Sequence, residues 1–341
     1  MQTTIPVDDA VGMILPHDIT EIVPGTFKGP AFKKGHIIRD EDIAHLKRLG
    51  KEHIYVVKLE SHQIHEDEAA RLMSAALIGE GARTSSAPVE GKITILADRD
   101  GLLKINKESL LRFNMLGEVM CSTLHDNTPV KKGEIIAGTR LIPLLSDRVI
   151  IEEAVQIAGS GSPVIQVRTL RQASAGLVIT GNEVFHGRIQ DRFEPVLRGK
   201  LQELGSEILQ VRFTPDDPDL IAEAIGACLS AGADLIVTSG GMSVDPDDVT
   251  REGIRRAGAT DIVYGTPVLP GAMFLTSRIG QVPVLGLPAC GMFHKITVFD
   301  LILPRILTGE SIGRKELAEL GHGGLCRSCK DCRYPVCNFG K

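Results

Sequence analysis

The feature that most constrains the fold is a regular alternation of apolar runs and helix-type segments in the second half of the chain. The runs AGLVIT (175–180), ADLIVT (233–238) and QVPVLGLP (281–288) have the length and composition of buried strands. Between them, FEPVLRGKLQELG (193–205) repeats leucine on one helical face, and PDLIAEAIGACLSAG (218–232) opens with proline and closes with glycine. This alternation predicts an α/β fold, in which a mostly parallel sheet carries helices on both faces.

The first half is expected to form a smaller β-rich region. Short β-type runs dominate from Lys92 to Pro143 and predict a small sandwich or barrel. Segments 62–78 and 148–158 have helical spacing, and GSGSP (159–163) marks a boundary. We therefore expect four parts: an N-terminal segment with a helix (1–88), a small β-domain with a connecting helix (89–161), the α/β domain (162–320) and a cysteine-rich tail (321–341).

Charge and composition argue against several classes of protein. The 341 residues carry a net charge of −5, with acids and bases mixed, and the chain has no tryptophan. A nucleic-acid stacking surface is therefore not expected. The longest uncharged stretch, 262–277, is broken by prolines and glycines and is too short to span a bilayer, and the first ten residues lack the pattern of a signal peptide. We expect a cytoplasmic protein without membrane contact.

Three strand ends carry polar, glycine-rich sequences: TGNE (180–183), TSGG (238–241) and LPACG (287–291). In a parallel sheet these ends share one edge, where open α/β folds bind ligands. The two glycines of TSGG can bring N–H groups close to an oxyanion, beside the hydroxyls of its Thr and Ser.

Carboxylates follow two of these strand ends. Their negative charge would repel a phosphate, so a site for phosphate alone does not explain them. A mixed ligand accounts for both features: the glycine turn binds a phosphate, while a carboxylate binds the N–H-rich edge of a pterin or guanine, or holds Mg²⁺. Each residue also has a purely structural explanation. The glycines suit a tight turn, Asp191 and Asp248 suit helix capping, and Glu183 suits a solvated loop.

At these residues the sequence resembles the molybdopterin-binding domain shared by molybdopterin adenylyltransferases (MogA-like) and molybdopterin molybdotransferases (MoeA-like, and gephyrin). The family motif Thr-Thr-Gly-Gly, six residues, then Asp-x-Thr matches 238–241 and 248–250. The upstream motif Thr-Gly-Asp/Asn-Glu, followed by an Asp before a helix, matches 180–183 and Asp191. TIPVDDAVGMILPHDIT (4–20) resembles the opening segment of the MoeA-like branch.

The resemblance covers about residues 173–308 and implies a three-layer α/β domain that binds molybdopterin, or its adenylylated form, at this edge. It implies that Asp191 and Asp248 are the essential, catalytic-type carboxylates, with Mg²⁺ as a possible companion. Homo-oligomers and transfer to molybdenum- or tungsten-enzyme apoproteins are expected on the same ground. The ligand-binding residues that it implies are Thr180, Gly181, Glu183, Thr238, Ser239, Gly240, Gly241, Ser243, Thr250 and Pro288.

The sequence departs from the MoeA-like branch where catalysis is concerned. LPGA (269–272) stands where that branch has Lys-Pro-Gly-Lys, and neither Leu nor Ala can neutralise molybdate or phosphate. The Gly-Leu-Pro-Gly-Asn-Pro turn has become GLPACG (286–291). We therefore predict pterin binding in molybdenum or tungsten cofactor biosynthesis or delivery, and leave open a transferase activity. The alternatives are a CinA-like nucleotide pyrophosphatase and a non-enzymatic carrier or redox sensor.

The tail contains four of the seven cysteines, spaced C-x₂-C-x₂-C-x₄-C. The first three spacings match those that wrap a [4Fe–4S] cluster, whereas the fourth departs from the usual run. A tetrahedral zinc site, with His322 as an alternative ligand, is the competing interpretation, and free thiols are the structural one. We expect a metal-binding tail that folds separately from the α/β domain. Its predicted ligands are Cys326, Cys329, Cys332 and Cys337.

Overall fold

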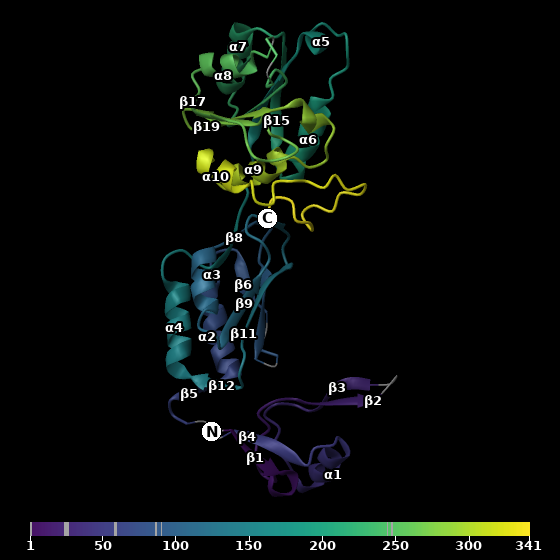
Figure 1. The fold of residues 1–341 in the computed structure, drawn as a ribbon, viewed down its shortest axis with the longest axis vertical. Helices are drawn as coiled ribbons and strands as arrows, with labels where there is room; N and C mark the ends of the chain where they lie inside the picture. The colour runs from purple at the N-terminus through teal and green to yellow at the C-terminus, as the bar shows by residue number, and fades with distance from the viewer. Residues whose placement is uncertain are drawn as a thin grey trace. The chain divides into compact units, whose positions relative to one another are not determined.

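The computed structural model describes residues 2–23, 27–57, 60–85, 87–89, 91–243, 245–246 and 248–341. The chain forms two compact units (Figure 1). The first comprises residues 1–98, 105–124 and 132–166, and the second comprises 99–104, 125–131 and 167–341. The described residues contain no helix with the length and apolar character needed to cross a bilayer.

The beginning of the first unit has two antiparallel strand pairs. β1 (Gln2–Pro6) pairs with β4 (His53–Val57), and β2 (Ile19–Val23) pairs with β3 (Phe27–Phe32). The 3₁₀ turn η1 (Val7–Asp9) and α1 (Asp40–Arg48) accompany them. Val7, Leu15 and Leu46 are buried together in a small core of their own.

The main part of the remaining first unit is one four-stranded antiparallel sheet covered by helices, with a separate pair of strands beside it, so the expected sandwich or barrel is wrong. The strand order is β6-β7-β11-β9. Helix α2 packs against β7, β11 and α4 and buries Ala69, Met73 and Leu77. The period-two burial of β7 shows one covered face, and a helix layer covers it instead of a second sheet. The elements are β5 (Gln63–His65), α2 (Glu66–Leu77), β6 (Ala82–Thr84), β7 (Lys92–Ala97), α3 (Lys107–Asn114), β9 (Val119–Thr123), β11 (Ile135–Leu141), β12 (Leu145–Asp147) and α4 (Arg148–Gly159).

The second unit confirms the predicted α/β fold. Its six-stranded sheet has the order β15-β14-β16-β19-β18-β17, in which β15, β14, β16 and β19 run parallel and β18 is antiparallel to both of its neighbours. The strands are β14 (Ser174–Thr180), β15 (Glu207–Thr214), β16 (Leu235–Ser239), β17 (Thr260–Tyr264), β18 (Leu275–Ile279) and β19 (Val282–Leu287). A separate three-stranded sheet is formed by β10 (Pro129–Val130), β8 (Gly101–Ile105) and β13 (Ile165–Arg168).

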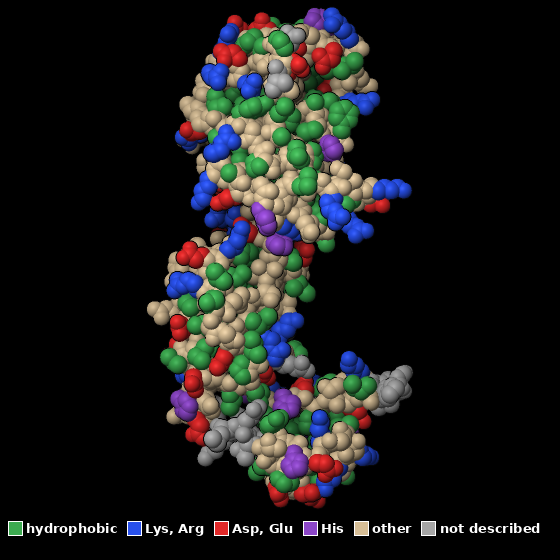
Figure 2. Space-filling model, viewed as in Figure 1, with side chains coloured by type: hydrophobic (Ala, Val, Ile, Leu, Met, Phe, Trp, Pro, Cys, Tyr) green, Lys and Arg blue, Asp and Glu red, His purple; other side chains and the backbone are tan. Residues whose placement is uncertain are grey.

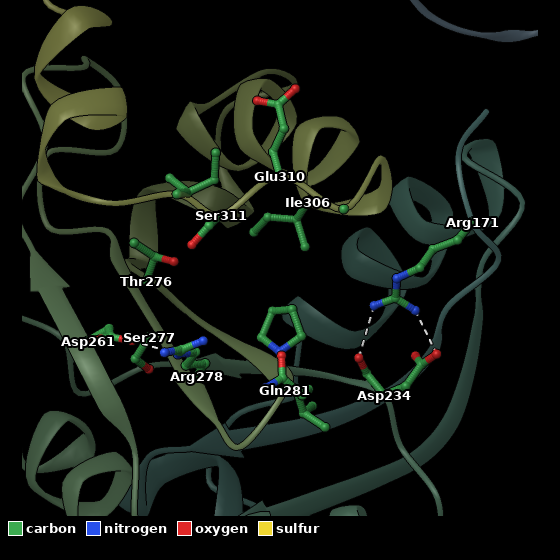
Figure 3. Close-up of a pocket in the computed structure, with 14 residues that line it drawn as sticks. Arg171, Asp234, Asp261, Thr276, Ser277, Arg278, Gln281, Ile306, Glu310 and Ser311 are labelled. Atoms are coloured by element: carbon green, nitrogen blue, oxygen red, sulfur yellow. Dashed lines mark hydrogen bonds and ion pairs between the residues drawn. The ribbon is translucent and has the colours of Figure 1, made fainter. Parts of the chain in front are cut away.

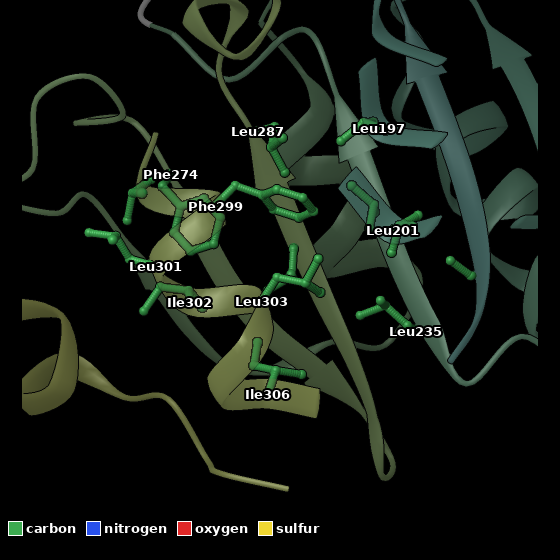
Figure 4. Close-up of a cluster of buried hydrophobic side chains, with 14 of the residues drawn as sticks. Leu197, Leu201, Leu235, Phe274, Leu287, Phe299, Leu301, Ile302, Leu303 and Ile306 are labelled. Carbon is green, nitrogen blue, oxygen red and sulfur yellow. The ribbon is translucent and has the colours of Figure 1, made fainter. Parts of the chain in front are cut away.

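Helices cover both faces of the six-stranded sheet because successive strand residues point to opposite sides. Leu177 belongs to the core under α6 (Phe193–Glu203) and α9 (Val298–Leu307), as Figure 4 shows for that side. The next residue, Val178, belongs to the core under α7 (Pro218–Ser230) and α8 (Thr250–Arg256). Shorter elements connect these layers: α5 (Asn182–Phe185), η2 (Ala289–Met292) and α10 (Arg314–Glu319).

Strand register brings the predicted ligand-binding segments to one edge. Ile179 pairs with Ser239, and Ser239 pairs with Leu287, so the carboxyl ends of β14, β16 and β19 are adjacent. Thr180 pairs with Thr214 on the other side, which adds the end of β15. The convergence expected from the sequence is therefore present, and it includes a fourth strand end.

Candidate functional site

A glycine turn follows β16 at this edge. Gly240 and Gly241 have φ values of 87° and 53°, which L side chains rarely adopt. A Cβ atom on Gly240 would overlap the carbonyl oxygen of Thr180, and one on Gly241 would overlap the hydroxyl of Thr250. Only glycine therefore allows the turn to lie this close to the end of β14 and the start of α8.

Buried hydroxyls hold the turn in place. The Thr180 hydroxyl donates to the main-chain oxygen of Ser239 at 3.1 Å and lies 2.9 Å from the Thr250 hydroxyl. Because Thr180 has one hydroxyl proton, the Thr250 hydroxyl donates to it. The Thr238 hydroxyl donates to the main chain of Leu285. Three residues predicted to bind a ligand thus have their hydroxyls engaged within the protein.

Ser239 differs from these three residues. It is fully buried, yet its hydroxyl has no hydrogen-bond partner among the described residues. The hydroxyl of Thr214, at the end of β15, is also buried without a partner in that part of the chain. Buried polar groups are nearly always hydrogen-bonded, so these two hydroxyls are exceptions at one strand edge, and a ligand can reach them only if the adjacent loops move. Sequence analysis missed Thr214, although the polar run TPDD after β15 was a usable signal.

The two predicted carboxylates have local partners. Asp191 accepts the N–H of Phe193 and the N–H of Glu194, each at 2.9 Å, and so caps α6. Asp248 accepts the N–H of Asp245 at 2.9 Å and stabilises its own loop. Both side chains are half-buried. A carboxylate has about four acceptor positions, so these contacts leave capacity for a ligand.

The loop after β14 is tied to the loop after β15. The N–H of Asn182 donates to Asp216 Oδ2 at 2.9 Å, a contact that sequence analysis did not anticipate. Gly181 has a φ of 140° and lies against the carboxylate of Glu183. Glu183 itself is exposed, and its main-chain oxygen accepts the N–H of Arg188 at 2.8 Å.

Two residues missed from the sequence fix the loop between β16 and α8. The Tyr264 hydroxyl donates to the main-chain oxygen of Met242 at 2.6 Å. The Arg251 guanidinium lies 4.3 Å from the centre of the Tyr264 ring, a cation–π contact, and donates to the main-chain oxygen of Ser243 at 3.5 Å. Arg251 therefore places a positive charge next to this loop.

Segments 286–291 and 269–272 complete the surroundings of the edge. Pro288 precedes η2, and burial raises the pKa of the Cys290 thiol within η2. Gly271 lies against Val298 at the start of α9. Leu269 is 55% exposed, so an apolar side chain faces solvent where the MoeA-like branch has a lysine.

A cavity of about 470 Å³ lies at the opposite edge of the sheet (Figure 3). Its residues Arg171, Asp234 and Gln281 precede β14, β16 and β19, so they lie at the amino ends of the parallel strands. Its charges are largely paired: Arg171 contacts Asp234 at 2.6 Å, and Arg278 contacts Asp261 at 2.6 Å. None of the residues predicted to bind a ligand lines this cavity.

The cysteine-rich tail lies within the second compact unit rather than apart from it. Cys326 and Cys337 are half-buried, whereas Cys329 and Cys332 are exposed, and all four line one cavity of about 1130 Å³. Within the described part of the chain, no three His, Cys, Asp or Glu side chains are already arranged to hold a metal ion. The predicted alternative ligand, His322, does not line this cavity.

Comparison with known proteins confirms the resemblance. Residues 176–308 match a family model described as a probable molybdopterin binding domain, and residues 4–58 match a domain of unknown function. The α/β domain of this chain therefore matches the molybdopterin-binding family, and CinA-like proteins and a molybdopterin molybdenumtransferase are among the curated proteins of similar sequence.

Individual relatives match only in part. A CinA-like protein of Mycobacterium tuberculosis (strain ATCC 25177 / H37Ra) is 42% identical over 91 residues, which make up 27% of this chain and 21% of that protein. A molybdopterin molybdenumtransferase of Haemophilus influenzae is 25% identical over 247 residues, or 70% of this chain and 55% of that protein. The solved structure of the molybdopterin biosynthesis enzyme MoaB from Thermus thermophilus has a TM-score of 0.35 and 22% identity, covering 41% of this chain and 98% of that one. The chain thus spans only part of the length of the CinA-like protein and of the molybdopterin molybdenumtransferase.

Proposed function

We propose that the protein binds molybdopterin, or its adenylylated form, at the carboxyl edge of the six-stranded sheet, in molybdenum or tungsten cofactor biosynthesis or delivery. The observation that carries this proposal is the Gly240–Gly241 turn at the carboxyl edge, whose positive φ values and close packing only glycine allows, within the segment that matches the family model. A phosphate at the turn accepts hydrogen bonds from the main-chain N–H groups, and movement of the turn on binding gives it the buried Ser239 hydroxyl as a further donor.

In this proposal the carboxylates recognise the other end of the ligand. Asp191 and Asp248 are half-buried at the loops that follow β14 and β16, and each retains acceptor capacity. They accept N–H groups of the pterin or hold a Mg²⁺ ion that bridges to the phosphate. Glu183 follows β14 and Thr214 ends the neighbouring strand β15, and Arg251 adds a positive charge to the loop after β16.

The proposed function is ligand binding, and its chemistry is limited by the residues at 269–272. If the protein is an enzyme, it is a transferase of the molybdopterin molybdotransferase or adenylyltransferase type. Leu269 and Ala272 supply no positive charge for molybdate, which favours a role in holding or delivering the pterin. Delivery to molybdenum- or tungsten-enzyme apoproteins, homo-oligomerisation and a cytoplasmic location belong to the same proposal. All seven cysteines are free thiols, in keeping with a reducing compartment.

The proposal is tested by the ligand that copurifies from a molybdopterin-producing host. Mass spectrometry and fluorescence of the oxidised pterin should detect molybdopterin, and Asp248→Ala should retain at least about tenfold less, since a lost charge-assisted hydrogen bond is worth about 1.5–3 kcal/mol. Asp245→Ala is the matched control, because Asp245 is exposed on the same loop and contributes its main-chain N–H to Asp248. Equal retention by all three folded proteins would remove Asp248 from the site.

A CinA-like nucleotide pyrophosphatase is the competing proposal, favoured by the 42% identity over 91 residues to a CinA-like protein. Its test is hydrolysis of dinucleotides or ADP-ribose by the purified protein. Hydrolysis that Asp248→Ala abolishes, with no pterin in the preparation, would replace the first proposal by this one.

A further inference from the structure

The tail forms a closed loop on the α/β domain. The N–H of Gly340 donates to the main-chain oxygen of Gly323 at 3.0 Å, which joins the two ends of the loop. Phe339 is only 4% exposed and belongs to the core under α6 and α9, and Gly340 lies directly against Leu301 of α9. Tyr334 packs against the same core. The loop therefore has its own attachment points before any ligand is bound.

A second attachment fixes the first cysteine of the loop. The N–H of Leu269 donates to the oxygen of Gly324, and the N–H of Cys326 donates to the oxygen of Leu269, both at 2.8 Å. Tyr264 pairs with Leu275, which pairs with Gly286, so the turn that contains Leu269 begins at the carboxyl edge of the sheet. The tail is thus attached to a segment that starts at the candidate pterin site.

A hydrogen bond to sulfur shapes the first Cys-x-x-Cys turn. The N–H of Ser328 donates to Cys326 Sγ at 3.4 Å. Ser328 has a φ of 49°, which few residues other than glycine adopt and which directs this N–H towards the sulfur. A hydrogen bond to sulfur stabilises the thiolate, the form of cysteine that binds metals.

Positively charged side chains line the same cavity as the four cysteines. Besides the four cysteines, it is lined by Arg327, Lys330 and Arg333 of the tail and by Lys295 of the segment between η2 and α9, with Asp331 as the acidic residue. Figure 2 shows blue Lys and Arg side chains on the projecting part of the tail. These cations would offset the negative charge that four metal-bound thiolates bring into the cavity.

We propose that this loop, together with the segment between η2 and α9, encloses a thiolate-ligated metal centre that is built into the pterin-binding domain. Cys326, Cys329, Cys332 and Cys337 are its ligands, and the metal is an iron–sulfur cluster or Zn²⁺. On binding, each thiol releases its proton to solvent and the sulfur ligates the metal. The centre is independent of the proposed pterin function, so either can fail without the other.

The composition of the centre is tested on the full chain purified without oxygen. Metal analysis should find either iron with acid-labile sulfide in about equal amounts, in a brown protein, or about one Zn²⁺ per chain. Replacing Cys329 and Cys332 with Ser should remove the metal. Cys290→Ser is the matched control, because Cys290 is a free thiol of the same domain that does not line the cavity. Absence of iron and zinc, both as isolated and after anaerobic reconstitution, would overturn the proposal.

The attachment to the domain is tested separately. Phe339→Ala should release its metal to a chelator at least about tenfold faster than the parent, because the loop loses its buried anchor. Val336→Ala, at a position 83% exposed on the same loop, should release metal at the parent rate. A folded Phe339→Ala protein that holds metal as long as the parent would show that the centre is a separate module and overturn this part of the proposal.

The turn at Ser328 provides a second measurement that leaves the core untouched. Ser328→Val disfavours the positive φ and should also accelerate metal release, because β-branched residues tolerate that conformation poorly. Ser328→Gly keeps both the N–H and the conformation and should behave like the parent. Equal release from Ser328→Val and Ser328→Gly would show that the turn does not form part of the site.

Discussion

Replacing Ser239 with Ala should change stability and ligand affinity in opposite ways. The Ser239 side chain is fully buried at the end of β16, and its hydroxyl has no hydrogen-bond partner among the described residues. Alanine removes this hydroxyl and preserves the rest of the side chain. The main-chain oxygen of Ser239, which accepts the Thr180 hydroxyl, is unaffected. The substitution therefore isolates the contribution of one oxygen atom.

The magnitudes follow from what that oxygen does in each state. An unpaired buried hydroxyl costs about 1–3 kcal/mol, so the ligand-free variant should be at least as stable as the parent and up to about that much more stable. The corresponding rise in Tm is about 2–4 °C per kcal/mol for a domain of this size. In the proposed complex, the adjacent turn moves and the same hydroxyl donates to a phosphate. Losing a bond worth about 1.5–3 kcal/mol should weaken affinity roughly tenfold to hundredfold.

Thermal unfolding of the ligand-free protein and anaerobic calorimetric titration with molybdopterin measure the two effects. Ser206→Ala is the matched control: its hydroxyl accepts the N–H of Ala173 at 3.0 Å, just before β15 at the other edge of the sheet. That variant should lose about 1–3 kcal/mol of stability and keep its affinity. If Ser239→Ala is destabilised like Ser206→Ala, or binds pterin as the parent does, the hydroxyl does not face the ligand.

Three further outcomes are expected. Because Leu269 and Ala272 stand where the MoeA-like branch has lysines, the protein should complement a strain lacking that enzyme poorly, and efficient complementation would show that the lysines are dispensable. Gly240→Ala should reduce pterin binding, since a Cβ would overlap the Thr180 carbonyl and displace the turn, and unchanged retention would exclude the turn from the site. Burial would raise the pKa of Glu310, but hydrogen bonds from Lys104 and Arg305 outweigh burial and lower this pKa below its ordinary value of 4.5. The ionised Glu310 therefore stabilises the fold above about pH 4.5, and this contribution is lost as the pH falls through the folded-state pKa. Glu310→Gln should make the free energy of unfolding less dependent on pH in the acid range. An unchanged pH dependence would contradict this prediction.

The sequence alone predicted how the α/β domain is assembled. Apolar runs too short for helices, separated by helical segments, leave a parallel sheet as the fold that buries both faces of each strand. Once the strands are parallel, the segments 180–183, 238–241 and 287–291 must share an edge. The family motifs around Asp191 and Asp248 could also be recognised in the sequence, because the residues of each motif are close together in the chain. In the first unit, alternation in β7 showed that one face is buried but not what covers it, so α2 was not foreseen as the helix packed on it.

Contacts between distant segments were decided only by the tertiary structure. The strand register placed Thr214 beside Thr180. The packing of the domain gave the Thr180 hydroxyl a partner but left the Ser239 hydroxyl without one among the described residues. In the tail, the cysteine spacing was visible in the sequence. The burial of Phe339 and the hydrogen bond from Cys326 to Leu269 were not, because they depend on surfaces formed by segments far away in the chain. Local sequence determines which conformations and pairings are available, because periodicity and backbone preference act over a few residues. Which buried polar group finds a partner depends on the packing of the whole domain.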